Sequence, residues 1–276
     1  MSDRRACQDQ SPSWELTFAA ESYGSSQSGL FRDCTIIYNG RLKVDRICGE
    51  MEELAKHGLR LPPNMQGLTD EQIEDLKLKD EWGEKCQPSG GVQFKKDEIG
   101  CRNGQAPTPK MTEVLTKIIK EAKDMISKIK VTADELVTQK TVKEAIDILR
   151  GAVTIVYPMG LPPHEPIKAE FENNEYLSAA LFKFTVKPLF VEKDIFLHFL
   201  LLFFKASLEV IEPDQASLWW AGKELLPAKK LGAFVGKNEK TKIVAKLQKR
   251  GQGAPAREPV LKRQFQGLNN IKWGPR

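Results

Sequence analysis

Cysteine and histidine are scarce in this chain of 276 residues, which holds five cysteines and three histidines. The cysteines are odd in number and widely spaced, without a Cys-x-x-Cys pair or a nearby pair of histidines. This pattern argues against a disulfide framework and against the usual zinc sites, and it is typical of a reducing compartment. We therefore expect no bound metal at the five positions Cys7, Cys34, Cys48, Cys86 and Cys101.

Recognisable catalytic and cofactor-binding motifs are also missing. None of the histidines, His57, His164 and His198, has a Ser, Cys or carboxylate partner at a characteristic spacing. The segment GAFVGK at 232–237 has one residue fewer between its glycines than a phosphate-binding loop requires, and Asn238 stands where that loop has Ser or Thr. The sequence therefore predicts no catalytic residues, no cofactor and no enzyme activity.

Apolar runs long enough to cross a membrane are absent. The longest run, IFLHFLLLFF at 195–204, has ten residues, whereas a spanning helix needs about 20. An interfacial helix is the alternative interpretation of this run. The polar start, MSDRRACQDQ, lacks the apolar segment of a signal peptide, which predicts a cytoplasmic protein without a transmembrane span.

Positive charge is concentrated toward the C-terminus. Residues 223–276 hold 14 Lys or Arg and 3 Asp or Glu, while the net charge of the whole chain is only +5. Such an asymmetry attracts acidic partners, which include RNA, anionic lipid and acidic protein surfaces. Charge alone does not distinguish among these partners.

Apolar spacing predicts a mostly α-helical protein with a minor β component (α+β), built from helical hairpins and long Pro/Gly loops in an extended arrangement. Residues 1–37 are rich in serine and show no clear period, so we expect a disordered or poorly anchored lead. An Asn39-Gly40 turn should precede the first helix, which ends at Gly58. A capping box of Thr69 and Gln72 begins the next helix.

Residues 38–178 are predicted to form a helical core with one short strand. The segment from Thr108-Pro109 and the helix 138–150 favour an antiparallel helical hairpin. The apolar run AVTIVY at 152–157 predicts this strand or, as the alternative, an extended core segment, with Gly151 ending the helix before it. Residues 179–206 are densely aromatic and form an insertion that must be buried, paired or membrane-associated.

Residues 207–276 are predicted to hold a tryptophan-pair helix, restarting at Pro213, and a basic docking region. Neighbouring residues of a helix point about 100° apart, so one tryptophan should lie in the core and the other at a partner surface. A cationic helix is expected at 238–250. The candidate partner-binding residues are Trp219, Trp220, Lys237, Lys240, Lys242, Lys246, Lys249, Arg250 and Arg257.

Recognition of a specific nucleic acid is not expected from this basic region. It carries no RNP motif, no zinc finger and no interleaved aromatic platform. A solvated basic face or a protein-docking helix is the favoured interpretation. Binding of RNA or an anionic membrane through phosphate attraction is the alternative.

Several blocks of sequence indicate a protein family, which composition alone does not. They are YNGRLKV (38–44), EMEELAKHG (50–58), LPPNMQGLTDEQIEDLKLKDEWGEKC (61–86), LRGAVTIVYPMGLPP (149–163), LWWAGKEL (218–225), VGKNEKTKIVAKLQKRGQGAPAREP (235–259) and IKW (271–273). In this order, they resemble the cilia- and flagella-associated protein 298 family, also called Kurly.

The resemblance implies a non-enzymatic adaptor of the cytoplasm, the cilium and the basal body. Such a factor would act in motile cilium biogenesis, in outer dynein arm assembly or delivery, and in ciliary positioning and planar cell polarity. Other dynein arm assembly factors are the implied partners, among them a MYND-type zinc-finger protein.

Three departures from the family pattern predict a variant or isoform. The lead at 1–37 is unlike the family's opening segment, which resembles half of a ubiquitin-like domain. The block at 179–206 replaces a few polar residues of the family. Glu258-Pro259-Val260 runs almost directly into Leu261, which omits a long charged helix and an acidic stretch and leaves a shortened C-terminal region.

Overall fold

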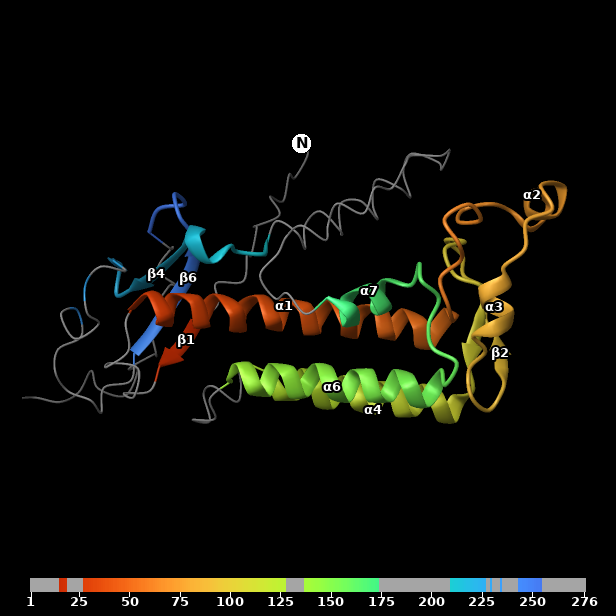
Figure 1. Ribbon diagram of the computed structural model, residues 1–276, viewed down its shortest axis with the longest axis horizontal. Helices are drawn as coiled ribbons and strands as arrows, with labels where there is room; N and C mark the ends of the chain where they lie inside the picture. Colours follow the sequence, from red (N-terminus) through yellow and green to blue (C-terminus); the bar gives the residue numbers. More distant parts are fainter. Residues whose placement is uncertain are drawn as a thin grey trace, which may run out of the picture. The chain divides into compact units, whose positions relative to one another are not determined.

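The computed structural model describes residues 15–18, 27–127, 137–173, 209–226, 229, 234 and 243–254 (Figure 1). The chain divides into two compact units. A helical unit comprises Ser28–Ala216, and a second unit combines Met1–Gln27 with Ser217–Arg276. These bounds differ from the predicted boundaries at 38, 178 and 207, because the second unit unites segments from the two ends of the sequence.

Three long helices form the centre of the helical unit: α1 (Gln27–His57), α4 (Pro109–Met125) and α6 (Gln139–Val156). They lie side by side in Figure 1, and a shared core of buried apolar side chains joins them. A shorter helix, α7 (Pro166–Glu172), is tied to α1 by an ion pair of 3.0 Å between Arg46 Nε and Glu170 Oε1. The largest apolar side chains of the core that are almost fully buried are Ile47, Met51, Leu54, Leu59, Leu115, Leu149, Tyr157 and Ile167.

The predicted hairpin of α4 and α6 is confirmed, because the two helices pack on each other and run in opposite directions (Figure 1). The predicted strand at 152–157 is wrong. Helix α6 continues through Gly151 to Val156, since Ala152, Val153 and Val156 extend its buried face at helical spacing. A side chain at Gly151 would meet open space, so this glycine does not end the helix.

Helix α1 corrects two expectations for the start of the chain. It begins at Gln27, inside the predicted disordered lead, and its buried residues Leu30, Phe31 and Cys34 already follow the helical period. It also passes through the expected turn at Asn39. The Asn39 amide binds both backbone groups of Ile211, accepting from its N–H at 3.1 Å and donating to its carbonyl at 2.8 Å. The asparagine at position 39 thus serves a contact with a distant segment of the chain and does not form a turn.

Shorter elements lie at the end of the helical unit where α1 ends and α4 begins (Figure 1). The predicted capping box is confirmed: Thr69 and Gln72 exchange backbone and side-chain hydrogen bonds at the start of α2 (Asp70–Asp75). Helix α3 (Glu81–Lys85) follows. Strands β2 (Val92–Phe94) and β3 (Gln105–Pro107) then pair antiparallel.

The second unit contains a four-stranded sheet in the order β1-β6-β4-β5. Strands β1 (Glu15–Phe18) and β6 (Ile243–Lys249) pair antiparallel. Strands β4 (Ala216–Trp220) and β5 (Lys223–Leu225) form a hairpin. Ala221 and Gly222, with φ of 50° and 79°, make its two-residue turn, as a hairpin of mirror-image type requires.

Both helices predicted near the C-terminus are strands. A 3-10 turn at Pro213–Gln215 leads into β4, which carries both tryptophans, and the expected cationic helix is replaced by β6. Buried Ala245 and Leu247 show the alternation of a strand. Taken together, the predicted mostly α fold with a minor β component is confirmed.

Within the described ranges, no helix is at once long enough and apolar enough to cross a bilayer. The aromatic block at 179–206, with its run 195–204, lies outside the residues that the structure describes, as does most of the segment 232–237.

Candidate partner-binding surfaces

The tryptophan pair lies on β4, so strand geometry places the two side chains on opposite faces of the sheet. Both are half-buried, whereas Leu218 is fully buried beside them. Trp219 Nε1 donates to Ser217 Oγ at 3.1 Å, and that hydroxyl donates to the carbonyl of Gln248 at 3.3 Å. The indole of Trp219 is therefore fixed against the neighbouring strand β6. The expectation that one tryptophan lies in the core is wrong, since both are partly accessible. The position of the other at a partner surface stays a prediction.

The two lysine candidates on the described strand β6 do not share a face of the sheet. Lys246 and Lys249 both belong to β6, but their odd separation places them on opposite faces of the sheet. Both are half-buried, and Arg250 is exposed in the turn that follows. In the sheet, β6 lies next to β4, the strand that carries both tryptophans. Four candidates, Lys237, Lys240, Lys242 and Arg257, lie outside the described residues.

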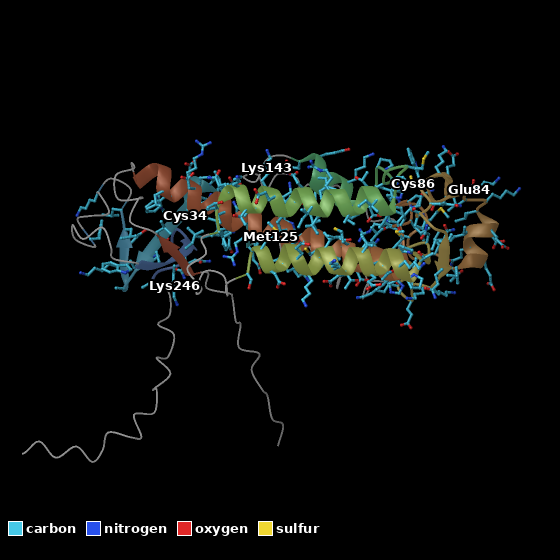
Figure 2. All side chains as sticks on the ribbon, turned by 90° about the horizontal axis from the view of Figure 1, so that it is seen from below. Cys34, Glu84, Cys86, Met125, Lys143 and Lys246 are labelled. Atoms are coloured by element: carbon cyan, nitrogen blue, oxygen red, sulfur yellow. The ribbon has the colours of Figure 1, made fainter. Side chains whose placement is uncertain are left out.

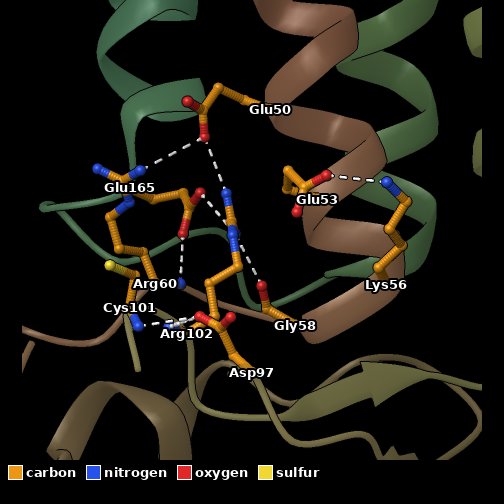
Figure 3. Close-up of polar contacts among 9 residues, drawn as sticks. All are labelled: Glu50, Glu53, Lys56, Gly58, Arg60, Asp97, Cys101, Arg102 and Glu165. Atoms are coloured by element: carbon orange, nitrogen blue, oxygen red, sulfur yellow. Dashed lines mark hydrogen bonds and ion pairs between the residues drawn. The ribbon is translucent and has the colours of Figure 1, made fainter. Parts of the chain in front are cut away.

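A second polar arrangement, in the helical unit, was not visible in the sequence. We call Glu50, Arg60, Arg102 and Glu165 the arginine–glutamate network (Figure 3). Arg102 donates to Glu50 at 2.8 Å, to Glu165 at 3.4 Å and to the carbonyl of Gly58 at 2.8 Å. The side chain of Glu165 is completely buried and that of Arg102 is 5% exposed.

Glu165 uses both carboxylate oxygens in this network. Oε1 accepts from the Arg102 guanidinium, and Oε2 accepts from the backbone N–H of Arg60 at 2.8 Å. The carbonyl of Arg60 in turn lies 2.8 Å from Nε2 of His164. A buried charge persists only when it is paired and hydrogen-bonded, and both conditions are met here.

The loop that delivers Arg102 is organised by Asp97. Its carboxylate accepts three backbone N–H groups: that of Ile99 at 3.1 Å and those of Cys101 and Arg102, each at 2.9 Å. Residues 102–103, after this loop, pair with the residues that follow α1: Arg60 and Arg102 form an antiparallel bridge, and the N–H of Asn103 donates to the carbonyl of Leu59 at 2.9 Å. The arginine–glutamate network therefore joins three loops to α1.

The chemistry available to these groups is structural. Both oxygens of Glu165 accept hydrogen bonds, and Oε2 of Glu50 accepts from Arg102, so these carboxylates tie segments of the fold together. Burial raises the pKa of Tyr157, and the charge of Glu165 adds to this effect. The phenol therefore stays neutral near pH 7.

The described cysteines are thiols without an activating environment. Burial raises the pKa of Cys48 to about 12, and it also raises the pKa of Cys34, Cys86 and Cys101. Cys34, on α1, and Cys86, after α3, are marked in Figure 2. A protonated thiol is a poor nucleophile and a poor metal ligand. Among the described residues, no group of three His, Cys, Asp or Glu side chains is placed to hold a metal ion.

Comparison with known proteins gives a consistent result. The profile of the family "Cilia- and flagella-associated protein 298" matches residues 216–270, which include β4, β5 and β6. The protein of that name from Homo sapiens is 52% identical, over 95% of this chain and 97% of its own length. The protein from Mus musculus is 50% identical over the same shares, and that from Drosophila melanogaster is 42% identical over 90% of this chain and 77% of its own.

The alignments with the human and mouse proteins run over 304 residues, more than the 276 of this chain, so both relatives hold positions without a counterpart here. No solved structure matches the chain. With about half of the residues identical over nearly the full length of two relatives, the chain belongs to the cilia- and flagella-associated protein 298 family.

Proposed function

We propose that this protein is a non-enzymatic adaptor in motile cilium assembly, where it aids the assembly or delivery of outer dynein arms. The observation that carries the proposal is the 52% identity to the human relative over 95% of the chain, because that relative is named for its association with cilia and flagella. The protein would act in the cytoplasm and at the basal body, and its loss would disturb ciliary positioning and planar polarity.

The described residues suit an adaptor. Their buried acids and bases neutralise one another, and their thiols are protonated, so the fold presents surfaces instead of reactive groups. Proteins that act by binding need exposed, ordered side chains. The half-buried tryptophans on β4 and the exposed Arg250, in the turn after the neighbouring strand β6, supply such side chains, which would bind an acidic protein partner. Another dynein arm assembly factor, such as a MYND-type zinc-finger protein, is the partner that we propose.

Rescue in ciliated cells tests this proposal. Cells that lack the endogenous family member should lose outer dynein arms, and expression of this chain should restore them, as seen by electron microscopy. Restored arms with the double substitution Trp219→Ala and Arg250→Glu would contradict the role of the sheet surface. A chain that is expressed and folded but restores no arms would contradict the assembly function.

The alternative, binding to RNA or to an anionic membrane, rests on the 14 basic residues between 223 and 276. Titration with RNA and with anionic vesicles at two salt concentrations would separate it from the adaptor proposal. Phosphate binding must weaken steeply as salt rises. The opposite faces of Lys246 and Lys249 favour a protein partner, because a phosphate backbone needs its cations on one side.

A further inference from the structure

Strand β2 has an open edge in the described part of the chain, where its sheet contains only β2 and β3. It lies beside α3 at the end of the helical unit (Figure 1). All three residues of β2 are exposed, and two of them are apolar: Val92 is 44% exposed and Phe94 is 76% exposed. A phenylalanine with three quarters of its surface in water is unusual on a folded domain and marks a candidate contact surface.

The backbone of β2 is oriented to accept another strand. In an antiparallel pair, residues that bond to the partner strand alternate with residues whose N–H and C=O groups point away from it. The N–H of Lys95 donates to the carbonyl of Gly104 at 2.8 Å, so Gln93, two residues earlier, also faces β3. Val92 and Phe94 therefore direct their N–H and C=O groups to the open edge.

We propose that β2 is a docking strand for an extended segment of a partner protein, which adds to the open edge as a further strand. Main-chain hydrogen bonds to Val92 and Phe94 would supply the pairing, and their exposed side chains would contact apolar residues of the segment. Cross-strand neighbours on one face interact directly, so the partner needs apolar residues at every second position.

The charge of Lys95 indicates which residues the partner segment should carry between its apolar positions. Successive side chains of a strand alternate between faces, so Lys95 lies on the face of Gln93, opposite to Phe94, and its side chain is exposed. An acidic residue opposite Lys95 would form a cross-strand pair of opposite charge. The favoured occupant is thus a segment in which acidic or polar residues alternate with apolar ones.

A second copy of this chain is a poorer occupant. Strand β2 has three residues, and a stable symmetric dimer buries on the order of 1,200–2,000 Å² in total. Pairing of two such short strands would bury less surface than this, so a dimer would need further contacts between the two copies. A partner segment that is not already folded adapts to the edge and to the surface around it.

The test uses the whole protein and a short synthetic peptide in which Asp and Glu alternate with Val. A second peptide has Lys in place of the acidic residues. Binding is measured by fluorescence anisotropy and by amide hydrogen exchange. The acidic peptide should bind more tightly and should slow exchange at the amides of Val92 and Phe94. Absence of binding by the acidic peptide, or binding without slower exchange at these two amides, would overturn the proposal.

Substitutions at the edge give a sharper readout. Phe94→Ala removes the apolar contact, while Phe94→Pro also removes the outward N–H without touching the bonds to β3. The proline variant should bind the acidic peptide more weakly than the alanine variant, by roughly tenfold. Equal binding by the two variants would contradict strand addition. Circular dichroism verifies that each variant is folded.

Charge reversal completes the design. Lys95→Glu should invert the preference, so that the basic peptide binds better than the acidic one. Leu76→Ala is the matched control, because Leu76 is an exposed apolar residue, at 60%, that follows directly after α2 and lies outside β2. Self-association of the free protein that Phe94→Pro abolishes would identify a second copy as the occupant and would overturn the proposal. These measurements use purified protein, so their outcome is independent of the ciliary function.

Discussion

Glu165 holds two segments of the helical unit at once, because one of its carboxylate oxygens accepts from the backbone of Arg60 and the other from the side chain of Arg102. Glu165→Ala should lower the free energy of unfolding by about 1–3 kcal/mol, since it removes one of the two carboxylates that pair with Arg102 and leaves the backbone N–H of Arg60 without its acceptor. Chemical denaturation measures this change.

Glu81→Ala is the control for this prediction. Glu81 pairs with Lys85 at 3.7 Å, but both side chains are mostly exposed, at 77% and 64%. Its removal should change the free energy of unfolding by less than about 0.5 kcal/mol. Similar losses for the two variants would show that the buried network has no special role in stability.

The Cys48 thiol makes stability depend on pH. Its pKa is raised by burial to about 12 in the folded protein, whereas an unfolded cysteine has a pKa of about 8.5. The folded state favours the protonated form, so the contribution is complete below about pH 8.5 and is lost as pH rises toward 12.

Cys48→Ala should therefore reduce the alkaline loss of stability. Above about pH 8.5, the free energy of unfolding should fall with pH less steeply for the variant than for the unmodified protein. The difference between the two slopes should reach up to about 1.4 kcal/mol for each pH unit. Denaturation at a series of pH values measures the two slopes, which should coincide below pH 7. Identical slopes in the alkaline range would contradict the burial of this thiol.

At the scale of elements, Asn39 determines how α1 meets the segment that precedes the sheet. Asn39→Ala removes both hydrogen bonds to Ile211 and leaves two buried backbone groups without partners. We expect the free energy of unfolding to fall by about 2–4 kcal/mol. Faster amide exchange at Ile211, with exchange in α6 unchanged, would locate the effect. A loss below about 0.5 kcal/mol would contradict it.

Helices could be predicted from the sequence where apolar residues recur at helical spacing within one continuous segment. The capping box at Thr69 and the hairpin of α4 and α6 follow from local spacing, and both are present. The start of α1 was missed because the serines around Leu30 and Phe31 obscured a period that those apolar residues do follow.

Strands near the C-terminus could not be predicted, because their period depends on distant partners. Ile243, Val244 and Leu247 fit a narrow helical stripe, yet the backbone of β6 pairs with residues 15–18 at the other end of the chain. Tertiary pairing overrides local propensity in such segments. The arginine–glutamate network was missed for the same reason, since Arg102 and Glu165 are 63 residues apart.

At the scale of the whole molecule, the aromatic block at 179–206 is the main liability for solubility. Deleting it should reduce aggregation of the purified protein, because a dense run of apolar residues promotes association wherever it is exposed. Light scattering at increasing protein concentration measures the effect. Deletion of residues 255–276, which leaves β6 and the turn after it intact, serves as the control. Equal scattering with and without the block would show that its apolar residues are covered.

The pairing of β1 with β6 has a consequence for how the protein is made. The residues of β1 leave the ribosome early, but their partner strand, Ile243–Lys249, is synthesised only near the end of translation. Helices α1, α4 and α6 lie between them in the sequence and can fold first, as segments synthesised earlier commonly do. Any message that ends before codon 243 would thus yield a chain whose first strand never finds its neighbour.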